Sequence, residues 1–134
     1  MAEPIASNGP RGYILLMDDE ESILDVMSQM LRRRGFEVTC VRDGADAVTA
    51  YRRALTDGAG FDVVVMDLSV PGGLGGREAI HLLREIDPGV RALASSGHSN
   101  DPVMMRPTEH GFVGVLPKPY SIAELVSAIE DALS

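Results

Sequence analysis

Short apolar runs alternate along this chain with segments in which apolar residues recur at helical spacing, and this alternation limits the folds that it can adopt. Five runs are typical of buried strands: residues 13–17, 36–41, 61–67, 90–96 and 111–116. Strands that are separated by helices must lie parallel, with right-handed crossovers and with helices on both faces of the sheet. At 134 residues, the chain fits one domain. The sequence therefore predicts a single α/β domain built from five strand–helix units.

The last two helices differ in how sharply the sequence bounds them. The fourth begins well, with Asp101 as a cap and Pro102 at the first helical position. Pro107 follows soon after, and because proline interrupts a helix, this helix is expected to be short, kinked or irregular. Ser121 and Glu124 have the spacing of a capping box at the start of the fifth helix.

Composition excludes several classes of protein. A net charge of −8 gives the chain no electrostatic reason to bind DNA or RNA non-specifically. The single cysteine, Cys40, rules out an internal disulfide, and no apolar run approaches the ~18 residues that would span a bilayer. Residues 1–11 are rich in Pro, Gly, Ser and Asn and lack the pattern of a signal peptide. We therefore expect a flexible tail or linker remnant at 1–11, a folded domain at 12–134, and a cytoplasmic protein without membrane insertion.

Polar residues gather where the strands end. The first strand runs into Asp18-Asp19, the third ends in Asp67, the fourth ends in Ser95-Ser96 and the fifth runs into Lys118. The functional crevice of an open parallel sheet lies beyond the carboxyl ends of its strands. These four strands are neighbours if the sheet is doubly wound in the flavodoxin-like order 2-1-3-4-5, which is the order that we expect. Three carboxylates, a hydroxyl and an ammonium group then meet at one rim.

Such a cluster of carboxylates needs positive charge. Two carboxylates about 4 Å apart repel by about 4 kcal/mol at an effective dielectric constant of ~20, whereas a whole domain is stable by only ~5–15 kcal/mol. Lys118 supplies one positive charge, and a hard divalent cation with oxygen ligands is the natural supplement. The acids therefore predict a Mg²⁺ site, although Asp18, Asp19 and Glu20 also suit an acidic helix start. Asp67, at the end of the most apolar strand, has the carboxylate that a nucleophile toward phosphorus requires.

Four segments together resemble the receiver domain of two-component response regulators. They read MDDEESI, DVVVMDLSVPGGLGG, ALASSG and GVLPKPYS, and their order and spacing are those of the family. The resemblance covers about residues 12–133, and the PGGLGG loop looks most like receivers attached to hybrid sensor histidine kinases. It implies a phosphoryl-accepting signalling switch, and it implies a histidine kinase or a histidine-phosphotransfer domain as the phosphodonor.

The resemblance also implies roles for individual residues. Asp67 is the expected phosphoacceptor, Ser96 the switch hydroxyl and Lys118 the partner of the phosphoryl group, with a peptide bond to Pro119 that is often cis in the family. Asp19 is expected to bind Mg²⁺ directly and Asp18 to lie close by. The full set of expected metal ligands is Asp18, Asp19, Asp67 and the backbone carbonyl of Ser69.

The expected output surface consists of the fourth helix, the fifth strand and the fifth helix. Val115 departs from the family pattern, because many members carry Tyr or Phe three residues before the lysine and this aromatic side chain rotates on phosphorylation. Coupling through such a rotation is not possible here. Self-phosphorylation and slow autodephosphorylation are implied, and whether the chain is part of a kinase polypeptide stays open.

Two other functions remain as alternatives. Val115 and the irregular fourth helix suit a pseudo-receiver that is not phosphorylated and acts as a docking or dimerisation module. A Mg²⁺-dependent phosphatase with an aspartyl nucleophile is a further alternative, but such enzymes usually carry a second acid two residues after the nucleophile, where this chain has Ser69. In every case we expect a monomer or a weak homodimer.

Overall fold

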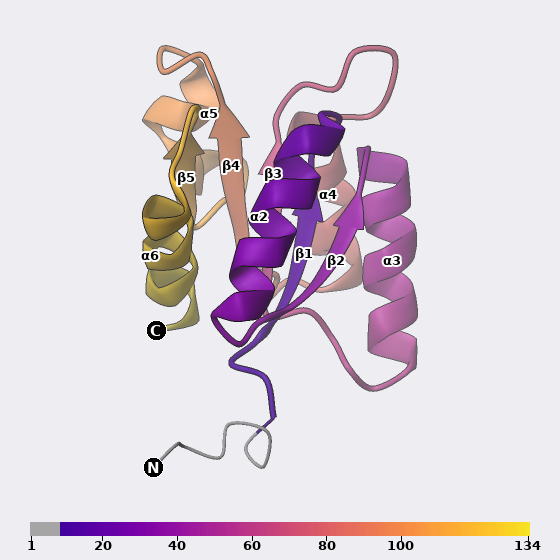
Figure 1. The fold of residues 1–134 in the computed structure, drawn as a ribbon. Coiled ribbons are helices and arrows are strands. Elements are labelled where there is room, and N and C mark those ends of the chain that lie inside the picture. The colour runs from indigo at the N-terminus through magenta and orange to yellow at the C-terminus, as the bar shows by residue number, and fades with distance from the viewer. Residues whose placement is uncertain (1–8) are drawn as a thin grey trace.

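A five-stranded parallel sheet forms the centre of the molecule, in the predicted order β2-β1-β3-β4-β5. The computed structural model describes residues 9–134, so residues 1–8 of the predicted tail lie outside the described part. Helices α2 and α6 cover one face of the sheet, and α3, α4 and α5 cover the other (Figure 1). The predicted doubly wound α/β fold is confirmed. Within residues 9–134, no helix is long and apolar enough to cross a membrane.

The strands are short and their carboxyl ends lie at one edge of the sheet, at the top of Figure 1. Every residue of the adjacent inner strands β3 and β4 is buried, as expected for strands covered on both faces. The parallel register aligns Asp67 with Ser95, and Ser96 with Pro117. The strands are β1 (Tyr13–Met17), β2 (Glu37–Val41), β3 (Val63–Asp67), β4 (Ala92–Ser96) and β5 (Gly114–Pro117).

The irregular fourth helix and the capping box are also confirmed. The side chain of Asp101 caps α5 by accepting a hydrogen bond from the N–H of Val103 at 2.9 Å, and a separate 3-10 helix begins at Pro107. The reciprocal hydrogen bonds between Ser121 and Glu124 are present at the start of α6. The helices are α2 (Glu21–Arg33), α3 (Gly44–Thr56), α4 (Gly76–Ile86), α5 (Pro102–Met105), the 3-10 helix η1 (Pro107–His110) and α6 (Ile122–Leu133).

Two apolar clusters hold the helices to the sheet. Alternate strand residues such as Met66 and Ala94 pack against α3, α4 and α5. The residues between them, such as Val65 and Leu93, pack against α2 and α6. Because side chains alternate along a strand, each strand residue belongs to one face or the other.

Two glycines allow α4 to begin directly beside the end of β3. A Cβ atom at Gly76 would lie 2.8 Å from the carbonyl oxygen of Asp67, and one at Gly75 would lie 2.4 Å from the carbonyl oxygen of Leu68. Both distances are shorter than real Cβ contacts. The helix therefore packs against the strand end only where no side chain is present.

Candidate functional site

Lys118 joins two buried acids that come from different strands. Its Nζ lies 2.8 Å from Oδ2 of Asp18, just beyond β1, and 3.1 Å from Oδ2 of Asp67, the last residue of β3. Asp18 is 1% exposed and Asp67 is 7% exposed. Oε1 of Glu20 lies farther away, at 3.6 Å, and its side chain is largely exposed. Two carboxylates thus share one cation where water has little access.

Backbone N–H groups hold the other oxygen of each carboxylate. The N–H of Glu20 donates to Oδ1 of Asp18 at 2.9 Å. The N–H of Ser69 donates to Oδ1 of Asp67 at 3.3 Å. In both cases an aspartate bonds to the backbone two residues ahead, as aspartates at turns commonly do. The turn after each strand therefore directs the second oxygen of the carboxylate toward Lys118.

Burial and charge shift the pKa values of this pair. Burial raises the pKa of Asp67, even though the bond to Lys118, the charge of Lys118 and the N–H of Ser69 act in the opposite direction. Burial alone would lower the pKa of Lys118, but its hydrogen bonds and charge interactions with Asp18 and Asp67 outweigh that effect, and the pKa is raised. Lys118 therefore stays charged over the physiological range.

The three acids predicted for the metal site lie together. Asp18, Asp19 and Asp67 each offer a carboxylate oxygen, and these oxygens lie within 4.8 Å of one another. Asp18 and Asp67 are buried, whereas Asp19 is partly exposed. A set of oxygen donors without nitrogen or sulfur suits a hard divalent cation. Within residues 9–134, Lys118 is the only cation paired with these carboxylates, so the cluster keeps the negative charge that such a cation would neutralise.

Ser96 is the last residue of β4 and lies beside the backbone of Lys118. Its Oγ accepts a hydrogen bond from the N–H of His98 at 3.0 Å. Its carbonyl oxygen accepts from the N–H of Lys118 at 2.9 Å, which keeps β4 and β5 aligned up to the site. The peptide bond between Lys118 and Pro119 is cis. The structure thus brings Ser96 to the rim that also holds Lys118 and the acids.

Two features of the rim have no counterpart in the predictions. Arg77 on the first turn of α4 binds Asp101 with hydrogen bonds of 3.1 and 2.6 Å. Ser95 has a buried Oγ with no hydrogen-bond partner among the described residues. No motif marks either feature, because both depend on how loops and side chains pack after the sheet has formed.

A shallow apolar groove opens beside the acidic cluster. It has a volume of about 430 Å³, and Ile23 and Met27 of α2 line it together with Lys118, Pro119 and Tyr120. Burial raises the pKa of Tyr120 to about 12, with a further contribution from the charge of Asp18. The groove therefore continues directly from the charged site onto an apolar surface.

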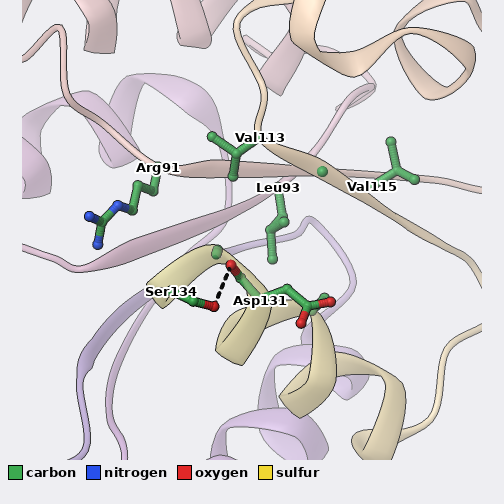
Figure 2. Close-up of a pocket in the computed structure, with 9 residues that line it drawn as sticks. Arg91, Leu93, Val113, Val115, Asp131 and Ser134 are labelled. Carbon is green, nitrogen blue, oxygen red and sulfur yellow. Dashed lines mark hydrogen bonds between the residues drawn. The ribbon is translucent and has the colours of Figure 1, made fainter.

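A larger groove of about 500 Å³ lies elsewhere, at the seam between β5 and α6. Figure 2 shows Arg91, Val113, Val115 and Asp131 around it. Arg91 precedes β4, whereas Ser96 ends that strand, so this groove extends toward the opposite end of the sheet from the acids. The acidic cluster therefore lies apart from this larger groove.

Comparison with known sequences identifies relatives of this arrangement. The chain matches the model of the response regulator receiver domain over residues 14–130. The sensory transduction protein RegX3 of Mycobacterium tuberculosis is 34% identical over 122 residues, which are 90% of this chain and 50% of that protein. The DNA-binding transcriptional regulator NtrC of Azospirillum brasilense is 34% identical over 121 residues, 90% of this chain and 24% of that protein. The chain thus spans half or less of the length of these relatives.

Solved structures agree with the sequence comparison. The receiver domain of sensor histidine kinase PA1611 from Pseudomonas aeruginosa, with a magnesium ion coordinated in the active site cleft, has a TM-score of 0.78 and 27% identity. The match covers 91% of this chain and 97% of that chain. A LuxR-family two-component response regulator from an Aurantimonas species has a TM-score of 0.78 and 33% identity, over 91% of this chain and 84% of that chain.

Proposed function

Because this chain belongs to the response regulator receiver domain family of two-component systems, we propose that it accepts a phosphoryl group on Asp67 in a reaction that requires Mg²⁺. One observation carries the proposal. Lys118 holds Asp67 and Asp18 together in a nearly buried site, at 3.1 and 2.8 Å. A carboxylate in this setting is positioned as a nucleophile, with a cation already present for the incoming phosphoryl oxygens.

In the proposed transfer, a carboxylate oxygen of Asp67 attacks the phosphorus of a phosphohistidine. A P–O bond to Asp67 forms as the P–N bond breaks, and the imidazole leaves with the electron pair of that bond and takes up a proton. Lys118 and the hydroxyl of Ser96 hold phosphoryl oxygens during the transfer. Bound Mg²⁺ supplies the positive charge that neutralises the remaining oxygens.

Asp18, Asp19, Asp67 and the backbone carbonyl of Ser69 are the proposed ligands of Mg²⁺. The spacing of the three carboxylates supports this assignment, as does the magnesium ion in the related PA1611 receiver. The protein contributes a fixed arrangement of oxygens, because Lys118 and the two backbone N–H groups restrain Asp18 and Asp67.

The apolar groove beside the site supports a helical phosphodonor. A histidine kinase or a histidine-phosphotransfer domain would place an apolar helix face against Ile23, Met27 and Tyr120 while its phosphohistidine reaches Asp67. The acidic composition of the chain gives no support to direct binding of nucleic acid. We propose a cytoplasmic location, where such donors act.

The proposed output surface consists of α5, β5 and α6. The phosphoryl group adds a charge of about −2, and movement of Ser96 and Lys118 toward it would shift a population between two states of this surface. Val115 lines the groove at the β5–α6 seam. Because valine is not aromatic, rotation of an aromatic ring at this position is not the readout. The PGGLGG loop supports the finer proposal that the chain is the receiver of a hybrid sensor kinase.

Incubation with acetyl phosphate and Mg²⁺ tests the proposed function. Mass spectrometry should find one added phosphate on the wild-type chain and none on Asp67→Asn. Asp57→Asn changes an exposed acid at the end of α3 and should leave the adduct unchanged. If the wild-type chain forms no adduct although Mg²⁺ is present, phosphoryl acceptance is refuted, and the pseudo-receiver remains as the alternative.

A further inference from the structure

Ser95 carries a hydroxyl that is buried beside the phosphoacceptor and has no partner. The residue is 1% exposed. Its Oγ is the only buried side-chain nitrogen or oxygen without a hydrogen bond in the part of the chain that the structure describes. Because a buried polar group without a partner destabilises a protein, such a group needs an explanation.

The register of the sheet makes Ser95 a neighbour of Asp67. The two residues are directly paired across β3 and β4, and the N–H of Leu68 donates to the carbonyl oxygen of Ser95 at 2.9 Å. Leu93 and Val65, two residues before Ser95 and Asp67, both pack in the cluster under α2 and α6. By alternation, the side chains of Ser95 and Asp67 lie on the same face of the sheet.

Lys118 passes over this position. It follows β5, yet its Nζ reaches the acids at the ends of β3 and β1. Since β4 lies between β5 and β3, and adjacent strands are about 4.8 Å apart, the side chain of Lys118 has to cross the end of β4. Every residue of β4 is buried, so the hydroxyl of Ser95 has little access to water at this position.

Phosphorylation would change which donors are available to Asp67. Before transfer, the N–H of Ser69 donates to one carboxylate oxygen and Lys118 to the other. The phosphoryl oxygens carry a charge of about −2 and attract the ammonium group of Lys118. One oxygen of Asp67 then loses its donor in a site with little access to water.

We propose that Ser95 is a positioning residue for the aspartyl phosphate, and this inference rests on the proposed function. Its hydroxyl, uncommitted before transfer, rotates and donates a hydrogen bond to the carboxyl oxygen of Asp67 that Lys118 leaves. Ser95 keeps its proton and forms no covalent bond. The hydroxyl of Ser95 thus destabilises the unphosphorylated state, in which it has no partner, and stabilises the phosphorylated state, in which it donates to Asp67.

Beryllium fluoride provides an equilibrium test, because it binds a carboxylate oxygen as a mimic of the phosphoryl group. Calorimetric titration of the Mg²⁺-loaded wild-type chain should show binding. Ser95→Ala should weaken that binding about 5- to 10-fold, the value of one hydrogen bond of about 1 kcal/mol or slightly more. Ser95→Thr keeps the hydroxyl and should restore the affinity to within about twofold of wild type. The affinity of Ser95→Ala for Mg²⁺ alone should be unchanged, since Ser95 is not a proposed ligand.

A second measurement uses the chain without metal. Ser95→Ala should raise its melting temperature, because the substitution removes an unpaired polar group. Ser28→Ala is the matched control: Ser28 is also buried, but its hydroxyl donates to the carbonyl oxygen of Asp25 at 3.3 Å. This control should lower the melting temperature and leave beryllium fluoride binding unchanged.

The outcomes separate the two proposals. A wild-type chain that does not bind beryllium fluoride refutes the proposed function itself. If the wild type binds and Ser95→Ala binds equally well, or if Ser95→Thr is as weak as Ser95→Ala, only the role of Ser95 is refuted. A lower melting temperature of Ser95→Ala without metal also refutes it, because the hydroxyl would then already have a partner.

Discussion

Arg77 and Asp101 are joined by a pair of hydrogen bonds, of 3.1 and 2.6 Å, between the first turn of α4 and the cap of α5. The loops after β3 and β4 are thereby tied together near Asp67, the proposed phosphoacceptor. The side chain of Asp101 is 12% exposed and that of Arg77 is 40% exposed, so solvent weakens the pair only in part.

Asp101→Asn should destabilise the domain at neutral pH and have a smaller effect in acid. The bond to Arg77 is the main cause that lowers the pKa of Asp101 below its ordinary value of 3.8. The stabilisation is therefore complete above pH 3.8 and is lost as the pH falls through the lower pKa of the folded state. Because asparagine can still cap α5, only the ion pair is lost. Urea unfolding should therefore show a decrease of about 1 kcal/mol in the free energy of unfolding at neutral pH. Equal stability of the two proteins at neutral pH would contradict this prediction.

Tyr51→Phe should destabilise the domain by about 1–2 kcal/mol without changing phosphorylation. The Tyr51 hydroxyl donates to Oδ2 of Asp87 at 2.6 Å and so joins α3 to the end of α4. Tyr51 is 2% exposed, and removal of its hydroxyl leaves the carboxylate of Asp87 with one donor fewer, since Gly89 still bonds Oδ1. Urea unfolding and acetyl phosphate labelling measure the two effects separately. Unchanged stability would show that the bond contributes nothing.

Gly76→Ala should lower the free energy of unfolding by about 1–3 kcal/mol, the usual effect of overpacking. The new Cβ would meet the carbonyl oxygen of Asp67 at 2.8 Å and Cβ of Met66 at 2.9 Å. Gly97→Ala is the matched control, because no atom lies within 4 Å of a Cβ at that position. Thermal unfolding of both variants tests the prediction. It is wrong if Gly76→Ala has the same melting temperature as the wild type.

Lys118→Gln should destabilise the metal-free chain by about 3–5 kcal/mol, because it leaves two buried carboxylates without their cation. Excess Mg²⁺ should recover part of this loss by supplying positive charge, and it should stabilise the variant more than the wild type. Urea unfolding with and without Mg²⁺ measures both effects. A deficit that Mg²⁺ does not reduce would argue against a cation site at these acids.

Met27→Asp should slow phosphorylation by a histidine kinase about tenfold or more, by placing a charge in the apolar groove beside the site. Acetyl phosphate needs no protein surface, so its reaction should be unaffected. Val26→Asp is the control, because Val26 neighbours Met27 on α2, is 52% exposed and does not line the groove. If both variants slow the kinase equally, the groove is not the docking surface.

Periodicity predicted the strands, but local contacts set where they begin. The run at 61–67 becomes a strand only at Val63. At Asp62 the backbone N–H donates to the carbonyl oxygen of Tyr13 at 2.7 Å, and the side-chain carboxylate accepts a hydrogen bond from the N–H of Tyr13 at 2.8 Å. The run at 111–116 becomes a strand only at Gly114. The preceding Phe112 is buried among the residues under α3, α4 and α5.

The centre of the site could be predicted because its groups stand at strand ends. A parallel sheet gathers such positions whatever the details of the loops, so Asp18, Asp67 and Lys118 meet as expected. The pairing of Arg77 with Asp101 depends instead on two loops taking one particular arrangement. The missing partner of Ser95 depends on how the neighbouring side chains pack around β4, which no sequence pattern encodes.

The chain order of the acidic cluster has a consequence for synthesis on the ribosome. Asp18 and Asp67 are translated long before Lys118, the residue that neutralises them. When β1, β3 and β4 have been translated, the carboxylates of Asp18 and Asp67 therefore still lack the positive charge of Lys118. The charged site can form only after β5 and the lysine that follows it have left the ribosome.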